Sequence, residues 1–207
     1  MKGLALCSGG MDSTVMLYDY QDSITGVVYF NYGSKQNAIE IKYAEYHCKK
    51  LKKKFNVVDL NFFDSFKSTL LSNRGTVPFG LSYSARKSTY VPFRNGIFLS
   101  IAGGMCEFLD YDSVYLAVNM EGWDVYKDCS EDFIHNMKYA IKFGTNKSID
   151  LYAPYLNKDK EYIVKQGIEL EVEIKKTYSC YRGGEIPCGK CAPCINLKEI
   201  FTRLDVK

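Results

Sequence analysis

The chain has 207 residues, of which 46% are hydrophobic and 25% charged, and its formal net charge at pH 7 is +3. These values are typical of a soluble globular protein with one core, and so small a charge argues neither for nor against a nucleic-acid partner. No apolar run is long enough to span a bilayer, and the N-terminus lacks the features of a signal peptide, so we expect a cytoplasmic protein with no membrane partner.

The first elements are an apolar run over 2–7, which predicts a buried strand, and an amphipathic run over 12–20, which predicts a helix. Gly9 and Gly10 lie between them. A strand that turns tightly into a helix leaves backbone N–H groups at the positive end of the helix dipole, and this arrangement binds phosphate groups. Glycine suits such a turn because it adopts positive φ and leaves room for an anion.

Residues 8–13 read Ser-Gly-Gly-Met-Asp-Ser, and Ser8, Ser13 and Thr14 can add hydroxyl donors to the turn. Asp12 can either cap the helix or hold a Mg²⁺ ion that the phosphates share. The stretch matches neither the Walker nor the dinucleotide-binding motif. It resembles S-G-G-x-D-S, the signature of the ATP pyrophosphatase loop family, whose members cleave ATP between its α- and β-phosphates. A glycine-rich turn that only connects strand to helix is the alternative.

The next hundred residues continue the alternation of strands and helices. Strands are predicted over 24–30 and 56–62, with a helix over 38–53 between them. This order implies an α/β fold in which helices cover both faces of a parallel sheet. Ligands of such sheets lie beyond the carboxyl ends of the strands, where the glycine-rich turn falls.

Residues 63–88 have no sustained period, and we expect a short helix over 66–71 followed by a loop. An irregular stretch of this length is either a lid or substrate loop, or surface padding. An apolar helix follows over 96–109, with Arg94 and Asn95 at its start. A guanidinium there opposes the helix dipole, so it indicates either a nearby anion or a structural salt bridge.

The last part of the main domain has a strand over 113–118, then a polar, aromatic and acidic segment over 119–129. Because this segment follows the carboxyl end of a strand, it is where we expect a small polar ligand to bind. The remaining predicted elements are a helix over 132–143, a strand over 150–155 and a helix over 157–169.

Four of the eight cysteines crowd into one segment near the C-terminus, namely Cys180, Cys188, Cys191 and Cys194. Four thiolates with x₂ spacings suit tetrahedral Zn²⁺, and a site filled by four protein ligands is structural. An iron–sulfur cluster and a redox dithiol are the alternatives. We therefore divide the chain into a nucleotide-binding domain, 1–176, and a zinc-binding segment, 177–207, that the metal pins with its helix 195–204 against the domain.

Of the other cysteines, Cys7 and Cys106 lie in apolar surroundings, which predicts core positions.

The loop and the cysteines occur with Phe-x-Tyr-Gly at 30–33, Tyr-Val-Pro-x-Arg-Asn-x-Ile-Phe-Leu-Ser at 90–100 and Ser-Cys-Tyr at 179–181. In this combination the chain, from about residue 3 to 203, resembles the 7-cyano-7-deazaguanine synthase family of the queuosine pathway. The resemblance implies a Rossmann-like adenine nucleotide alpha hydrolase fold, one zinc, ATP with Mg²⁺, and commonly a homodimer. It also implies that 7-carboxy-7-deazaguanine, a deazapurine carboxylic acid, and ammonia become a nitrile through an adenylated carboxylate and an amide.

The resemblance also implies roles for individual residues. The ATP-binding set is Ser8, Gly9, Gly10, Asp12, Ser13 and Thr14. The catalytic set is Asp12, Ser13, Arg94 and Lys160. The substrate-binding set is Arg94, Asn95, Asn119, Glu121 and Asp128.

The chain departs from the family pattern in three places. The family usually has Tyr-Gly-Gln-Arg-His where this chain has Tyr-Gly-Ser-Lys-Gln at 32–36, and Pro-Gly-Arg-Asn-Thr where it has Pro-Phe-Arg-Asn-Gly at 92–96. Ala192 replaces an acidic residue. We expect Phe93, in place of a glycine, to reshape the wall of the pocket. The departures at 34–36 and 93–96 leave one alternative open: a relative that joins a deazapurine acid to a protein acceptor in an antiphage defence system. The loop class leaves a second alternative, a tRNA-modifying ATP pyrophosphatase. A non-enzymatic module that binds zinc and nucleotide is the last alternative.

Overall fold

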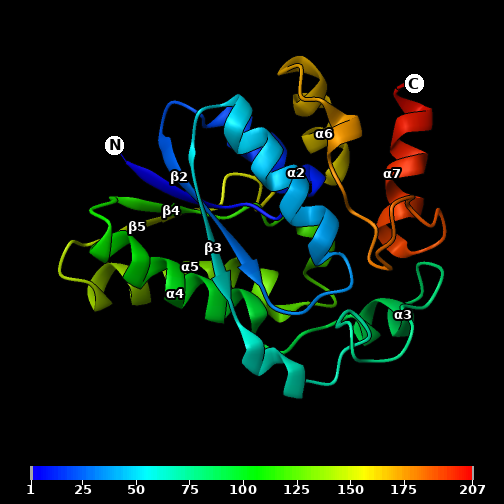
Figure 1. Ribbon diagram of the computed structural model, residues 1–207, viewed down its shortest axis with the longest axis horizontal. Helices are drawn as coiled ribbons and strands as arrows, with labels where there is room; N and C mark the ends of the chain where they lie inside the picture. The colour runs from blue at the N-terminus through cyan, green and yellow to red at the C-terminus, as the bar shows by residue number, and fades with distance from the viewer. Residues whose placement is uncertain (1, 207) are drawn as a thin grey trace.

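The computed structural model describes residues 2–206, and a five-stranded sheet lies at its centre (Figure 1). The strands are β1 (Gly3–Leu6), β2 (Ile24–Asn31), β3 (Lys54–Asp59), β4 (Ser113–Tyr115) and β5 (Asp150–Tyr152). Their order is β3-β2-β1-β4-β5, and every neighbouring pair is parallel. The predicted parallel sheet is confirmed. The strand order reverses between β1 and β4, so a ligand is expected at their carboxyl ends.

Helices cover both faces of this sheet. One layer contains α1 (Met11–Asp19), α2 (Asn37–Lys50), α6 (Lys160–Glu169) and α7 (Ala192–Arg203). The other layer contains α4 (Arg94–Phe108) and α5 (Glu131–Gly144), and Figure 1 shows these two on the opposite side of the sheet from α2 and α6. The short elements are α3 (Tyr83–Ser88) and the 3₁₀ turns η1 (Asn61–Ser65), η2 (Met120–Gly122), η3 (Lys127–Cys129) and η4 (Ile174–Lys176).

The alternation of side chains along β1 explains the two layers. Leu4 and Leu6 are buried in the core that contains α4 and α5, whereas Ala5 and the adjoining Cys7 are buried in the core beneath α1, α2 and α6. Cys106 is also buried, so the predicted core positions of Cys7 and Cys106 are confirmed. Among residues 2–206 no helix is long and apolar enough to cross a membrane.

The segment between β3 and α4 differs from the prediction. The helix expected over 66–71 is absent, and a 3₁₀ turn forms earlier, at η1, where the fully buried Phe63 stacks on Phe62 and contacts Phe66 edge to face. The aromatic cluster therefore decides the conformation here, and local periodicity does not. Helix α3 was not predicted from the sequence, because six residues are too few to show a hydrophobic period. Ser82 caps this helix by accepting a hydrogen bond from the Ala85 N–H at 3.3 Å.

Two helix boundaries move because of local chemistry. Helix α6 begins at Lys160, not at 157, since the Asp159 carboxylate accepts a hydrogen bond from the Tyr162 N–H at 2.7 Å and caps the helix. Helix α7 begins at Ala192, three residues before the predicted start, with Pro193 in its first turn.

Candidate active site

The turn between β1 and α1 has the geometry of an anion-binding loop. Gly9 has φ +75°, and a Cβ at this position would clash with the carbonyl oxygen of Glu40 in α2, so only glycine fits. Gly10 is the N-cap of α1, and its carbonyl accepts from the Thr14 N–H at 3.0 Å. Asp12 therefore does not cap the helix; it lies in the first turn. The N–H groups at this helix end face the carboxyl edge of the sheet.

Hydroxyl groups surround this turn. The Ser13 Oγ accepts from the Ser8 N–H at 3.1 Å, and the Ser8 Oγ accepts from the Gly10 N–H at 3.3 Å. The Ser179 Oγ, far along the chain, accepts from the Met11 N–H at 3.4 Å. Because hydroxyls rotate, these contacts keep the amides oriented without blocking access of an anion.

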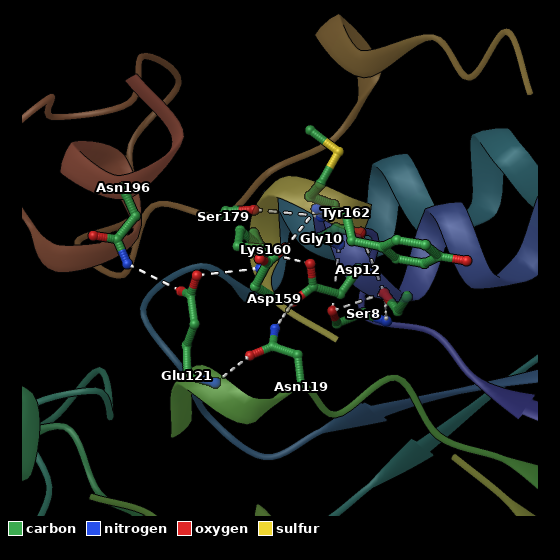
Figure 2. Close-up of polar contacts among 12 residues, drawn as sticks. Ser8, Gly10, Asp12, Asn119, Glu121, Asp159, Lys160, Tyr162, Ser179 and Asn196 are labelled. Carbon is green, nitrogen blue, oxygen red and sulfur yellow. Dashed lines mark hydrogen bonds and ion pairs between the residues drawn. The ribbon is translucent and has the colours of Figure 1, made fainter. Parts of the chain in front are cut away.

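Asp12 and Lys160 form an ion pair at the mouth of the turn (Figure 2). Lys160 is the first residue of α6 and is buried, and the Asp12 carboxylate also accepts from the Asn119 side-chain amide at 3.0 Å. The pair thus joins three segments, α1, the end of β4 and α6, at the point where the strand order reverses. A charged lysine held there can neutralise phosphate charge.

Glu121 holds the same assembly together from η2. Its carboxylate accepts from the Lys160 backbone N–H and from the Asn196 side-chain amide of α7, both at 3.2 Å, and its own N–H donates to the Asn119 side-chain oxygen at 3.0 Å (Figure 2). Asn119 and Glu121 thus contact the Asp12–Lys160 pair. Asn196 was not predicted from the sequence. The residues after the cysteine cluster predict a helix, but they do not indicate which face of that helix lies toward the site.

Arg94, Asn95 and Asp128 form a second polar group at the start of α4. The Asp128 carboxylate accepts from the Asn95 N–H at 2.9 Å, and the Asp128 backbone carbonyl accepts from the Asn95 side-chain amide at 3.0 Å. The Arg94 guanidinium donates to the Tyr32 hydroxyl at 3.1 Å and lies 5.5 Å from the centre of the Tyr32 ring. The structure therefore brings these three predicted residues together.

The guanidinium of Arg94 has capacity for an anion. Among residues 2–206 no carboxylate forms an ion pair with it, and its Nε is buried without a partner. Burial alone would lower the pKa of Arg94, but Tyr32, Tyr181 and Asp128 raise it, so the group stays charged. The structural salt bridge that was the alternative reading of Arg94 is therefore wrong, and the prediction of a nearby anion remains.

Glu40, which sequence reasoning did not single out, is a buried carboxyl beside these groups. Burial raises its pKa from 4.5 to about 8, while the Arg94 charge and hydrogen bonds from Tyr29 and Gln36 lower it. The Tyr29 hydroxyl donates to Glu40 at 3.4 Å. No sequence motif marks Glu40, because it reads as one acidic residue in the first turn of an amphipathic helix.

One cavity of about 320 Å³ connects all these groups. It is lined by the turn after β1, by the second polar group and by aromatic side chains, including Ser8, Asp12, Ser13, Tyr32, Gln36, Glu40, Tyr90, Arg94, Asn95, Phe98, Asn119, Glu121, Tyr126, Asp128, Lys160 and Tyr181. A second hollow of about 520 Å³ shares Arg86, Glu121 and Asn196 with it. The cavity is large enough for a small organic ligand, and the hollow adjoins it.

The irregular segment 63–88 contributes to the wall of this cavity. Arg86 lines it and forms an ion pair with Asp124. Before Arg86 in the sequence, the Gly80 N–H donates to the Lys190 carbonyl at 2.9 Å, and the Arg182 guanidinium donates to the Val77 carbonyl at 2.6 Å. The segment is thus attached to the cysteine loop and to the cavity rim, which excludes surface padding.

The four predicted metal ligands come together: the sulfur atoms of Cys180, Cys188, Cys191 and Cys194 all lie within 4.8 Å of one another. A tetrahedral zinc site with Zn–S bonds of about 2.3 Å requires sulfur atoms about 3.8 Å apart. The Cys188 sulfur also accepts from the Cys191 N–H at 3.3 Å. The donor set therefore fits a single ion, and its spacing favours one ion over a cluster of several irons.

The cysteine segment contacts the loop directly: the Tyr178 N–H donates to the Gly9 carbonyl at 2.9 Å. The segment that contains the four cysteines thus supports the turn that faces the cavity.

Phe93 does not reshape the cavity as expected. It has φ +53°, a conformation that suits the glycine of the family pattern, and its side chain is half exposed and absent from the cavity lining. Its ring lies where a Cβ at Gly96 would be and contacts Phe133 edge to face. The two departures at 93 and 96 therefore compensate each other outside the cavity.

Comparison with known proteins agrees with this geometry. The family described as "Queuosine biosynthesis protein QueC" matches residues 2–205. The chain belongs to this family. Proteins named 7-cyano-7-deazaguanine synthase are similar to it: the one from Porphyromonas gingivalis is 37% identical over 95% of this chain and 90% of its own length, and the one from Caldicellulosiruptor saccharolyticus is 36% identical over 100% and 93%.

A more distant member of the same name, from the archaeon Methanosarcina mazei, is 30% identical over 100% of this chain and 96% of its own length. Among solved structures, NMN synthetase from Francisella tularensis superposes with a TM-score of 0.53 over 99% of this chain and 77% of that one, at 13% identity. That similarity concerns the fold alone, and it confirms the Rossmann-like prediction.

Proposed function

We propose that this chain is a 7-cyano-7-deazaguanine synthase, which uses ATP to convert 7-carboxy-7-deazaguanine and ammonia into the nitrile. The observation that carries the proposal is that a phosphate-binding turn with the Asp12–Lys160 pair and a buried, anion-ready Arg94 line the same cavity. A triphosphate and a planar acid can thus meet there. Membership of the family supports the same reading.

In the first half of the reaction the substrate carboxylate attacks the α-phosphorus of ATP, and the bond to pyrophosphate breaks. We propose that N–H and hydroxyl groups of Ser8, Gly9, Gly10 and Ser13 hold the leaving pyrophosphate. Thr14, predicted to belong to this set, is fully buried and absent from the cavity lining, and its N–H donates to the Gly10 carbonyl. Lys160 neutralises charge as it develops, and Asp12 orients Lys160 and would also ligate the Mg²⁺ that accompanies ATP. Ammonia then displaces AMP to give the amide, and a second adenylation leads to the nitrile.

The deazapurine acid is proposed to bind at the second polar group. Arg94 would pair with its carboxylate, and Asn95 and Asp128 would contact the base. Asn119 and Glu121 line the same cavity, and they are proposed to contact the bound substrate while they hold Asp12 and Lys160 in place. Catalysis then consists mainly of positioning and neutralisation of charge.

The four cysteines are proposed to hold one structural Zn²⁺, which would stabilise residues 177–207 as a segment distinct from the nucleotide-binding domain, 1–176. With four protein ligands no position is open for substrate, so the metal would supply folding energy and no chemistry. The homodimer and the cytoplasmic location implied by the resemblance also remain proposals; light scattering during gel filtration would measure the mass in solution.

The other acceptors are not favoured. The three relatives described above are 30–37% identical over nearly the whole chain, and each carries the name of the nitrile-forming synthase. Of the altered segments that motivated a protein acceptor, 34–36 and 93–96, residues Phe93 and Gly96 lie outside the cavity lining, whereas Gln36 lies within it.

The test is a reaction of purified protein with ATP, Mg²⁺, 7-carboxy-7-deazaguanine and ammonium, analysed by mass spectrometry. The proposal predicts the nitrile together with AMP and pyrophosphate, and the amide as an intermediate. An unchanged acid at full saturation with ATP and ammonium would refute it.

A further inference from the structure

Glu40 lies where the nitrogen chemistry of this reaction would occur. It is in the first turn of α2, and its backbone carbonyl packs against Gly9 so closely that no side chain is tolerated there. Its side chain lines the cavity although only 8% of the residue is exposed. The start of α2 is therefore fixed against the phosphate-binding turn, and the carboxyl opens into the cavity that the turn faces.

The Glu40 carboxyl has no ion-pair partner among residues 2–206, and the charge that lowers its pKa most is that of Arg94. Burial raises its pKa to about 8, so it changes charge close to neutral pH. A buried carboxyl of this kind, left without a salt bridge in a cavity, has the properties of a general base.

Gln36 supplies a second acceptor. Only 4% of it is exposed, it lines the cavity, and its side-chain oxygen is buried without a partner among the described residues. It also lies close enough to Glu40 to lower the pKa of that carboxyl. A buried oxygen without a hydrogen-bond donor destabilises the protein unless a ligand supplies the donor. The amide oxygen and the carboxylate together therefore suit a ligand that presents N–H groups, such as a primary amide.

The proposed reaction requires loss of N–H protons at its second stage. The amide oxygen attacks the α-phosphorus of the second ATP, pyrophosphate leaves, and one N–H proton is lost, which gives an O-adenylated imidate with one remaining N–H. To form the nitrile, that N–H bond must also break. An N–H of this type is a weak acid, so its removal benefits from a positioned base.

We propose that Glu40 is the catalytic base of nitrile formation and that Gln36 positions the nitrogen for it. The Glu40 carboxylate takes the remaining N–H proton, the electron pair of that bond forms the third carbon–nitrogen bond, and the carbon–oxygen bond breaks so that its electron pair leaves with AMP. The products are the nitrile, AMP and protonated Glu40, which returns the proton to solvent. This inference rests on the proposed function, because it assigns one step of that reaction.

The test compares Glu40→Gln with wild type at each stage separately. With the acid, ATP and ammonium, the variant should accumulate the amide, and with the amide as substrate it should form nitrile about 100-fold more slowly or worse. Glu45→Gln, an exposed carboxylate on the same helix, is the matched control and should behave as wild type. Equal loss at both stages, or no loss at the second, would overturn the inference.

A measurement on the wild type decides the matter independently of whether the variant folds. The rate of the amide-to-nitrile stage should rise about tenfold per pH unit below an apparent pKa near 8 and then level off, whereas amide formation from the acid, measured at a constant concentration of free ammonia, lacks this dependence. The titratable groups facing Glu40 are Tyr29, Tyr32 and Cys7, whose pKa values are all raised by burial, and Arg94, which stays charged. None of them ionises in this range, and a flat profile would contradict the role of Glu40. A wild type that leaves the acid unchanged would instead refute the proposed function itself.

Discussion

At the scale of single residues, the Asp12–Lys160 pair is the least exposed ion pair of residues 2–206, with 21% and 11% of the two side chains accessible. Lys160→Ala is expected to reduce pyrophosphate release by about 100-fold or more, because it removes the charge that stabilises the transferring phosphoryl group. It should also lower the melting temperature, since Asp12 is left without its partner. Steady-state assays and thermal unfolding measure the two effects.

Lys165→Ala is the control for this prediction. Lys165 belongs to the same helix, but its side chain is 53% exposed and pairs with Glu161 one turn away. Exposed pairs of this kind contribute little, so activity and melting temperature should match wild type. Similar activity of the two variants would show that Lys160 does not act on the phosphates.

Gly9 allows a test of the loop geometry itself. Gly9→Ala should abolish ATP turnover and destabilise the protein, because the new Cβ meets the Glu40 carbonyl and φ is positive. Gly104→Ala in α4 is the matched control: a Cβ there contacts nothing, and alanine in a helix interior should stabilise by about 0.5–1 kcal/mol. Urea unfolding of both variants gives the comparison, and an active Gly9→Ala would contradict the assigned backbone conformation.

The residues of the site differ in whether their sequence neighbours make their position predictable. The positions of Gly9, Asp12 and the four cysteines could be predicted, because the turn and the cysteine cluster each depend on spacing within a short stretch of chain. Glu40, Gln36 and Asn196 could not, because each reaches the cavity only through the way a helix packs against a distant loop. Arg94 was identified because its positive charge lies at the positive end of a helix dipole. It is the one residue of the site for which an unfavourable local arrangement pointed to a contact with a distant part of the chain.

At the scale of elements, the type and order of the strands and longer helices were predictable, whereas α3 and η1 were not. The strand predicted over 56–62 is observed as β3, Lys54–Asp59, and the last residues of the prediction belong to η1. The segment that contains α3 and η1 is shaped by contacts far along the chain. Arg182 and Lys190 of the cysteine loop lie over the Phe79 ring at 4.6 and 5.5 Å, and Gly80 bridges to Cys191. The cysteine loop thus contacts both the segment 77–82 and, through Tyr178, the turn between β1 and α1.

This arrangement predicts that the metal affects the active site at a distance. Removal of zinc with a chelator should lower the melting temperature and weaken ATP binding, because the contact of Tyr178 with Gly9 depends on the ordered cysteine segment. Cys191→Ser should have the same effect and lose the bound metal. Cys48→Ala, a buried cysteine of α2, should lose some stability but keep one zinc per chain by elemental analysis. Full zinc content in Cys191→Ser would exclude the four-cysteine site.

At the scale of the whole molecule, stability and activity share one buried group. Glu40 has a pKa of about 8 in the folded protein against 4.5 as its ordinary value. The folded state therefore holds a proton that the unfolded state releases, so the stabilising contribution is complete below about pH 4.5 and is lost as the pH rises toward 8. The difference amounts to at most about 5 kcal/mol. Near neutral pH the Glu40 carboxyl therefore lowers the stability of the folded protein, as expected of a group that is retained for a catalytic role.

The measurable consequence is a pH-dependent gain in stability for Glu40→Gln. Because glutamine does not ionise, the free energy of unfolding of the variant minus that of wild type should increase from about pH 5 to about pH 8 and then remain constant. Urea unfolding of both proteins across this range gives the difference. The buried His47, whose pKa is lowered by desolvation, destabilises both proteins equally as the pH falls, so it cancels. A difference that does not change with pH would mean that Glu40 is ionised throughout, and it would remove the physical basis for its action as a base near neutral pH.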